Sequence, residues 1–225
     1  MDDLTYESNP EAAFKRLLRS PKLPYLVEQF QVVLEDEHTR RERFYEEMTE
    51  TEKTEFINGE VIVQSPVKLQ HSEASDNLLT LLSAYVKKHK LGMVRHEKIL
   101  ITLTRNDYEP DICFFTQEKS HRFYPDQMKF PAPDFIVEIL SPSTEAIDRG
   151  VKFEDYAAHG VREYWLVDPE RETIEQYGLH GAAYELLVKV NSGMIRSHVV
   201  ERFQLAVRAV FDEQEYLQAL KEVVG

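Results

Sequence analysis

Two acidic residues stand in short apolar runs of this sequence, where a buried strand usually carries an aliphatic side chain. Asp111 opens the run 111–115, and Glu138 interrupts the run 133–140. A carboxylate is costly to bury without a partner, so such residues typically bind a metal, pair with a cation or take part in catalysis. A cation, Lys152, follows in the next predicted element. These three residues are therefore the candidate site.

Two carboxylates on neighbouring strands with a lysine beside them could hydrolyse a phosphodiester bond. That reaction needs a nucleophilic water and neutralised charge at phosphorus, and a divalent ion held by carboxylates supplies both. Mg²⁺ prefers oxygen ligands and keeps several waters, so Asp111 and Glu138 suffice if their strands are neighbours. Lys152 could orient the water or stabilise the transition state. The residues alone also fit a buried ion pair or polar strand caps, with Lys152 a solvated helical lysine.

The elements that must position these residues can be predicted from the spacing of apolar side chains. Asp111 shares one face of the first strand with Cys113 and Phe115. The second strand covers 134–140, where Glu138 lies on one face and the apolar residues at odd positions lie on the other. Each acidic side chain should therefore project from a strand whose other face packs in the core.

A helix over 147–159 is predicted to follow the second strand. Lys152 and Tyr156 are four residues apart, so they lie on one face of this helix. Gly160 is a typical terminating residue, and 161–168 then reads as another strand.

The rest of the chain alternates between helical and strand patterns. Asn58-Gly59 between alternating apolar residues predicts a hairpin over 55–66. The other segments predict helices at 11–19, 25–52, 71–90 (with Gly92 past its end) and 212–223, a strand at 93–104, an exposed loop at 116–132, and an antiparallel meander at 173–177, 184–190 and 194–200 that continues the sheet.

Composition indicates an ordered protein of the cytoplasm. The chain has 225 residues, 42% of them hydrophobic, and a single cysteine, which excludes an internal disulfide. The acidic start lacks a secretory signal, and no stretch approaches the roughly 18 apolar residues of a membrane span. A net charge of −13 argues against a broad nucleic-acid-binding surface. It does not exclude a small cleft where a bound divalent ion supplies positive charge.

Motifs of other chemistries are missing from the sequence. There is no HExxH, paired CxxC, GxSxG, P-loop or GxGxxG, and the eight histidines lack zinc spacing. The sequence therefore gives no support to a zinc hydrolase, a serine hydrolase or a nucleotide-binding enzyme.

Several segments resemble a known family. The pair Pro110-Asp111, followed on a later strand by Glu138-Ile139-Leu140, resembles the PD-(D/E)XK motif of restriction-endonuclease-like nucleases. The run 133–169 is similar to the Uma family of endonucleases within that superfamily, and the segment 56–71 is similar to the opening motif of that family. The resemblance covers about residues 50–215.

The resemblance implies an α/β fold with a mixed sheet and a restriction-endonuclease-like αβββαβ core. An N-terminal helical extension, 1–52, would precede a nuclease domain, 53–225, that ends in the strand meander. Leu140 occupies the position two after Glu138 where the superfamily lysine normally sits. Because a lysine stem is long and flexible, Lys152 could bring its amine to the same place from the following helix.

The resemblance also implies roles for particular residues. Asp111 and Glu138 would bind Mg²⁺, with Mn²⁺ as a substitute, and Lys152 would be the catalytic lysine. Glu60 and His71 match the opening motif and are second-tier candidates. His71 equally fits a residue that bonds backbone at a helix start.

Two functions follow from this resemblance. The first is a metal-dependent endonuclease that hydrolyses phosphodiester bonds in DNA with metal-activated water, as a homodimer without membrane attachment. The alternative is a catalytically inactive nuclease-fold module that acts by binding a partner. The three retained polar residues favour the enzyme, whereas the negative charge and the displaced lysine favour the module.

Overall fold

The computed structural model describes residues 10–49 and 51–225, so the acidic start of the chain lies outside the described residues. Contacts divide the chain into two units, Met1–Met48 with Asn58–Glu60, and Thr49–Ile57 with Val61–Gly225. The first contains α1 (Pro10–Leu18) and α2 (Leu23–Glu47). The helix predicted over 25–52 ends at Glu47, because Met48 adopts an extended backbone. The predicted boundary between residues 52 and 53 stays a prediction.

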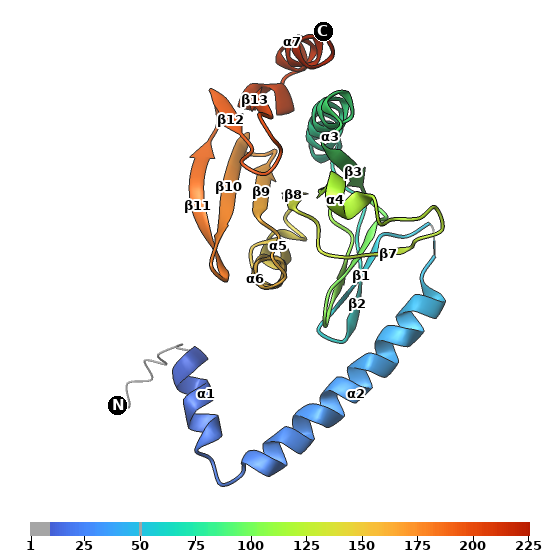
Figure 1. Ribbon diagram of the computed structural model, residues 1–225, viewed down its shortest axis with the longest axis vertical. Helices are drawn as coiled ribbons and strands as arrows, with labels where there is room; N and C mark the ends of the chain where they lie inside the picture. The colour runs from blue at the N-terminus through green and yellow to red at the C-terminus, as the bar shows by residue number, and fades with distance from the viewer. Residues whose placement is uncertain (1–9, 50) are drawn as a thin grey trace. The chain divides into compact units, whose positions relative to one another are not determined.

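The second unit is built on a six-stranded sheet in the order β11-β10-β9-β8-β6-β3 (Figure 1). Strands β8 and β9 are parallel, and the other neighbours are antiparallel. The strands are β3 (Gly92–His96), β6 (Ile112–Thr116), β8 (Phe135–Ile139), β9 (Glu163–Asp168), β10 (Thr173–His180) and β11 (Ala183–Val190). The helices are α3 (Leu69–His89), α5 (Glu145–Asp148) and α6 (Val151–Ala158). The predicted αβββαβ core consists, in chain order, of α3, β3, β6, β8, α5 with α6, and β9, and β10 and β11 extend its sheet.

A smaller five-stranded sheet has the order β2-β1-β5-β4-β7. Its strands are β1 (Thr54–Ile57), β2 (Glu60–Val63), β4 (Leu100–Thr102), β5 (Asp107–Tyr108) and β7 (Lys129–Phe130). The predicted hairpin is confirmed, since Asn58 and Gly59 have φ values of 51° and 84° between β1 and β2. Positive φ at both central residues is typical of a tight turn that matches the twist of the strands.

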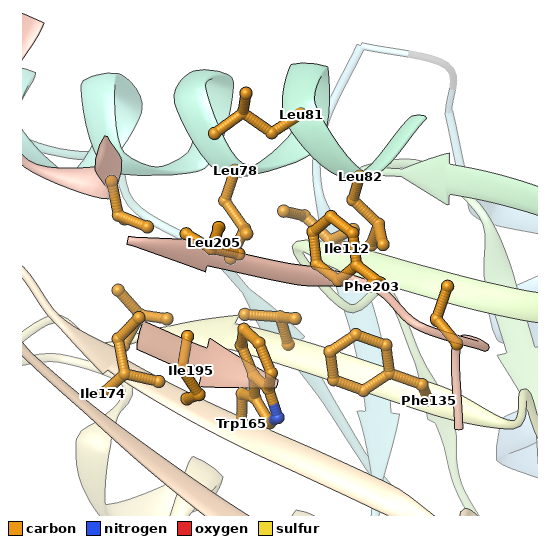
Figure 2. Packing of buried hydrophobic residues seen from close by; sticks show 14 of the residues in the cluster. Leu78, Leu81, Leu82, Ile112, Phe135, Trp165, Ile174, Ile195, Phe203 and Leu205 are labelled. Carbon is orange, nitrogen blue, oxygen red and sulfur yellow. The ribbon is translucent and has the colours of Figure 1, made fainter. Parts of the chain in front are cut away.

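The central strands of the six-stranded sheet, β6, β8 and β9, are buried on both faces. One face packs against α3 and the C-terminal segments, with Phe135, Trp165 and Leu78 in one apolar cluster (Figure 2). These C-terminal segments are β12 (Met194–Arg196), β13 (Gln204–Ala206), the 3-10 helix η1 (Val207–Val210) and α7 (Glu213–Val224). The other face packs against α6 and the smaller sheet in a second cluster. The alternation predicted for β6 and β8 is confirmed: Cys113, Phe115 and Ile136 lie in the second cluster.

Some predicted elements are wrong. The strand over 93–104 is two strands, β3 and β4, in different sheets, because Glu97 and Lys98 have positive φ. The C-terminal end of α3 is closed by Lys90 in the left-handed conformation, and Gly92 is the first residue of β3. The predicted loop 116–132 contains α4 (Gln117–Ser120) and β7.

Two further predictions need correction. The helix over 147–159 is broken into α5 and α6, because the backbone of Gly150 (φ −109°, ψ −104°) leaves the helical region. The segment 194–200 does not extend the large sheet, since β12 pairs with β13 in a two-stranded sheet of its own. None of the described helices is long and apolar enough to cross a membrane.

Candidate functional site

The two predicted carboxylates face each other across adjacent strands. Because Ile112 pairs with Val137 in the antiparallel register of β6 and β8, Asp111 lies opposite Glu138. The Asp111 amide donates to Glu138 Oε2 at 3.2 Å, and the Ile139 amide donates to Asp111 Oδ2 at 2.8 Å. Both side chains are buried. The structure therefore brings together the pair that the sequence singled out.

Lys152 reaches this pair from α6, as predicted. Its Nζ lies 3.1 Å from Glu138 Oε1, and the Tyr156 hydroxyl donates to the same oxygen at 3.0 Å. Lys152 Nζ also lies 3.0 Å from Glu55 and 3.1 Å from Asp148. Burial lowers the pKa of Lys152, but the attraction of these carboxylates outweighs burial and holds that pKa well above its ordinary value. Lys152 is therefore a permanent buried cation.

Three residues of the site were not predicted. Lys53 Nζ lies 2.7 Å from Asp111 Oδ1, and Glu55 follows two residues later in β1, which begins at Thr54. Asp148 is buried against Lys152. The i, i+4 spacing of Asp148 and Lys152 could have revealed this pair. No comparable sequence signal marks Lys53.

A pocket opens above these charges. Lys53, Asp111, Glu138, Asp148 and Lys152 line it, together with the loops 64–68 and 141–144. The second-tier candidate His71 also lines it, with Nε2 3.6 Å from Asp111 Oδ2. Glu60, the other second-tier candidate, is exposed at the start of β2 and is not among the residues that line the pocket.

The site carries an excess of negative charge. Four buried carboxylates surround two lysines, which leaves a formal charge of −2 when all six groups are ionised. The carboxylates are Glu55, Asp111, Glu138 and Asp148, and the lysines are Lys53 and Lys152. Burial raises the pKa of Glu138 to about 8 although Lys152 opposes the shift. Burial also raises the pKa of Asp111, but Lys53 and His71 outweigh it and the pKa lies below its ordinary value. A cation with charge +2 would favour the ionised form of Glu138 and would then balance the cluster.

The donor set fits one kind of metal better than another. Among the described residues no three His, Cys, Asp or Glu side chains are grouped so as to hold an ion. A structural zinc site needs such a group, whereas Mg²⁺ takes one or two carboxylates and keeps its waters. Asp148 Oδ1 is buried without a hydrogen bond in the described part of the chain, although Lys152 Nζ is 3.1 Å away. The formal charge of −2 on the fully ionised cluster fits a hydrated divalent ion.

Comparison with known proteins identifies the family. Residues 41–208 match the Uma2 family, whose description is "Putative restriction endonuclease". This match covers well over half of the chain. The chain belongs to the Uma2 family. The resemblance drawn from the sequence is thereby confirmed, and all six charged residues of the site fall within the matched part of this Uma2 protein.

Individual proteins are also similar to this chain over much of its length. An uncharacterized protein of Synechocystis sp. is 28% identical over 154 residues, which are 68% of this chain and 86% of the relative. A second uncharacterized protein of the same organism is 32% identical over 136 residues, covering 58% of this chain and 68% of the relative. The crystal structure of "a putative nuclease belonging to DUF820" from Anabaena variabilis is similar, with a TM-score of 0.63 and 20% identity. It covers 78% of this chain and 96% of its own, and it shows that the fold is nuclease-like.

The Uma2 chain has no lysine at the position two after Glu138. Leu140 occupies it, and the Leu140 side chain packs in the second apolar cluster. Lys152 instead delivers its ammonium to Glu138 from α6. The displaced lysine expected from the sequence thus does reach the carboxylate.

Proposed function

We propose that this Uma2 protein is a metal-dependent endonuclease that hydrolyses phosphodiester bonds in DNA. The observation that carries the proposal is the pair Asp111 and Glu138, which meet on adjacent strands and line one pocket. Membership of a family whose description is "Putative restriction endonuclease" supports a nucleic-acid substrate. Mg²⁺ is the proposed cofactor, and Mn²⁺ would replace it.

Asp111 and Glu138 would hold the ion, which when bound would activate a water and neutralise charge on the phosphate. The chain itself fixes both carboxylates before any substrate arrives. The Asp111 amide binds one oxygen of Glu138, while Lys152 and Tyr156 bind the other. The Ile139 amide likewise holds Asp111. Such preorganisation lowers the cost of assembling the site during the reaction.

Cleavage of supercoiled plasmid DNA tests the proposal. The parent protein would be assayed with Mg²⁺, with Mn²⁺ and with a chelator, beside Asp111→Asn and Glu138→Gln. Asp134→Asn is the matched control, because Asp134 is a buried acid next to β8 that does not line the pocket. We expect metal-dependent nicking by the parent and the control, and its loss in the two site variants. Equal cleavage by all four proteins would overturn the assignment.

One observation favours the inactive module as a second candidate. Every oxygen of Asp111 and Glu138 already has a donor within the protein, and Lys53 holds Asp111 Oδ1. A chain that never binds metal would be stable in this form. Titration calorimetry with Mn²⁺ separates the two: heat of binding by the parent but not by Glu138→Gln favours the nuclease, and no heat from either favours the module.

The homodimer predicted from the resemblance remains a proposal as well. Light scattering coupled to size-exclusion chromatography would give the mass of the particle. A mass of one chain at micromolar concentration would exclude the dimer.

A further inference from the structure

The two lysines of the site differ in how many carboxylates already hold them. Lys152 Nζ lies 3.0–3.1 Å from Glu55, Glu138 and Asp148, and its side chain is 2% exposed. An ammonium group has three N–H donors. Three buried carboxylates surround it, so a phosphate would have to displace one of them to reach this lysine.

Lys53 has a different environment. Its Nζ contacts one carboxylate among the described residues, Asp111 at 2.7 Å, and its side chain is 20% exposed. It lines the pocket that also contains Glu138. A lysine ammonium is ordinarily cationic at neutral pH. In the part of the chain that the structure describes, Asp111 is the one hydrogen-bond and ion-pair partner of this ammonium, which leaves two of its three donors for a ligand.

We infer that Lys53 is the catalytic cation that contacts the scissile phosphate, a role that the family resemblance would give to Lys152. This inference rests on the proposed nuclease function. Lysine is a compact charge on a flexible stem, so Lys53 can pair with Asp111 before substrate binds and turn to a phosphate oxygen afterwards. No covalent step involves Lys53; it neutralises charge that develops on the phosphate.

The position of Lys53 has a second consequence. Lys53 and a divalent ion both neutralise Asp111, so they compete for the same carboxylate. Removing the lysine should therefore strengthen metal binding while it weakens catalysis. A residue with a merely structural role would not change these two quantities in opposite directions.

The test compares Lys53→Met, Lys53→Arg and a matched control in the full chain. The control is Lys119→Met, because Lys119 is also half-buried and paired with a buried acid, Asp134 at 3.2 Å, but does not line this pocket. Calorimetry with Mn²⁺ alone gives the metal affinity. Single-turnover cleavage of a labelled DNA duplex gives the rate, and thermal melting confirms folding.

We expect Lys53→Met to bind Mn²⁺ more tightly than the parent and to cleave about 100-fold more slowly, the loss typical of one transition-state donor. Lys53→Arg should keep part of the rate, and Lys119→Met should match the parent in both assays. If the parent cleaves DNA and Lys53→Met cleaves it at the same rate, the inference is overturned and the nuclease function still stands. A folded parent without any cleavage would overturn both.

Discussion

Replacing Lys152 by Met should destabilise the protein strongly, because this substitution removes a buried cation from three carboxylates. Glu55, Glu138 and Asp148 lie 3.0–3.1 Å from Nζ, and none of these side chains is more than 2% exposed. Breaking a buried ion pair by removing one partner typically costs about 3–5 kcal/mol. In a domain of this size each kcal/mol lowers the melting temperature by about 2–4 °C. The expected fall is therefore about 6–20 °C.

Urea and thermal unfolding of Lys152→Met, Glu138→Gln and the double variant would measure this effect. Glutamine has the shape of Glu138 without its charge, and the Tyr156 hydroxyl can still donate to its oxygen. The double variant should therefore be more stable than Lys152→Met alone, which gives a coupling energy between the two residues. If Lys152→Met lowered the free energy of unfolding by less than about 1 kcal/mol, Lys152 would not be held in a buried ion cluster, since exposed ion pairs contribute that little.

Three further predictions concern parts of the fold outside the site. Hydrogen bonds from Arg149 lower the pKa of Glu175 to about 2, so Glu175 stabilises the folded chain above its ordinary pKa of about 4.5 and loses this effect as pH falls towards 2. Urea unfolding at pH 7 should therefore show Glu175→Gln to be less stable than the parent, with a smaller difference at pH 3. Gly92→Ala would place a methyl group 2.1 Å from the Phe115 carbonyl oxygen, so its melting temperature should fall further than that of Gly181→Ala, whose methyl group meets nothing within 4 Å. Cys113 is fully buried and burial raises its pKa, so a thiol reagent should label it in urea but not in buffer.

The strands that carry the site could be predicted because their side chains alternate. Asp111 and Glu138 each replace an apolar residue in a two-residue period, and that period fixes the face of the strand to which they belong. Asn58-Gly59 likewise marks its turn through the positive φ that both residues tolerate. These signals are local, so a single sequence carries them.

Other features depend on contacts between distant segments. The break between β3 and β4 lies at Glu97 and Lys98, which adopt positive φ without the glycine or asparagine that would announce it. Lys53 meets Asp111 across 58 positions of the chain, and a lysine before a strand usually lies in solvent. Residue type and spacing cannot reveal such pairs.

Contacts between distant segments also explain why the C-terminal segment does not extend the large sheet. Glu163 of β9 is fully buried, and one of its oxygens accepts hydrogen bonds from the Ser197 hydroxyl and the His198 and Val199 amides. These bonds hold the turn after β12 against β9, so β12 pairs with β13 and not with β11. The sequence shows a glutamate in a strand but not the loop that satisfies it.

The buried charges of the site also bear on how this family changes over evolutionary time. Apolar residues of similar volume can replace a whole buried ion network with no loss of stability, and often with a gain. Selection for folding alone would therefore not maintain Lys53, Glu138 and Lys152 among apolar neighbours. A lineage that gave up the chemistry could drift towards a more stable, uncharged interior within a few substitutions. Whether a given relative keeps charged residues at these positions thus distinguishes catalytically active members of the family from inactive ones.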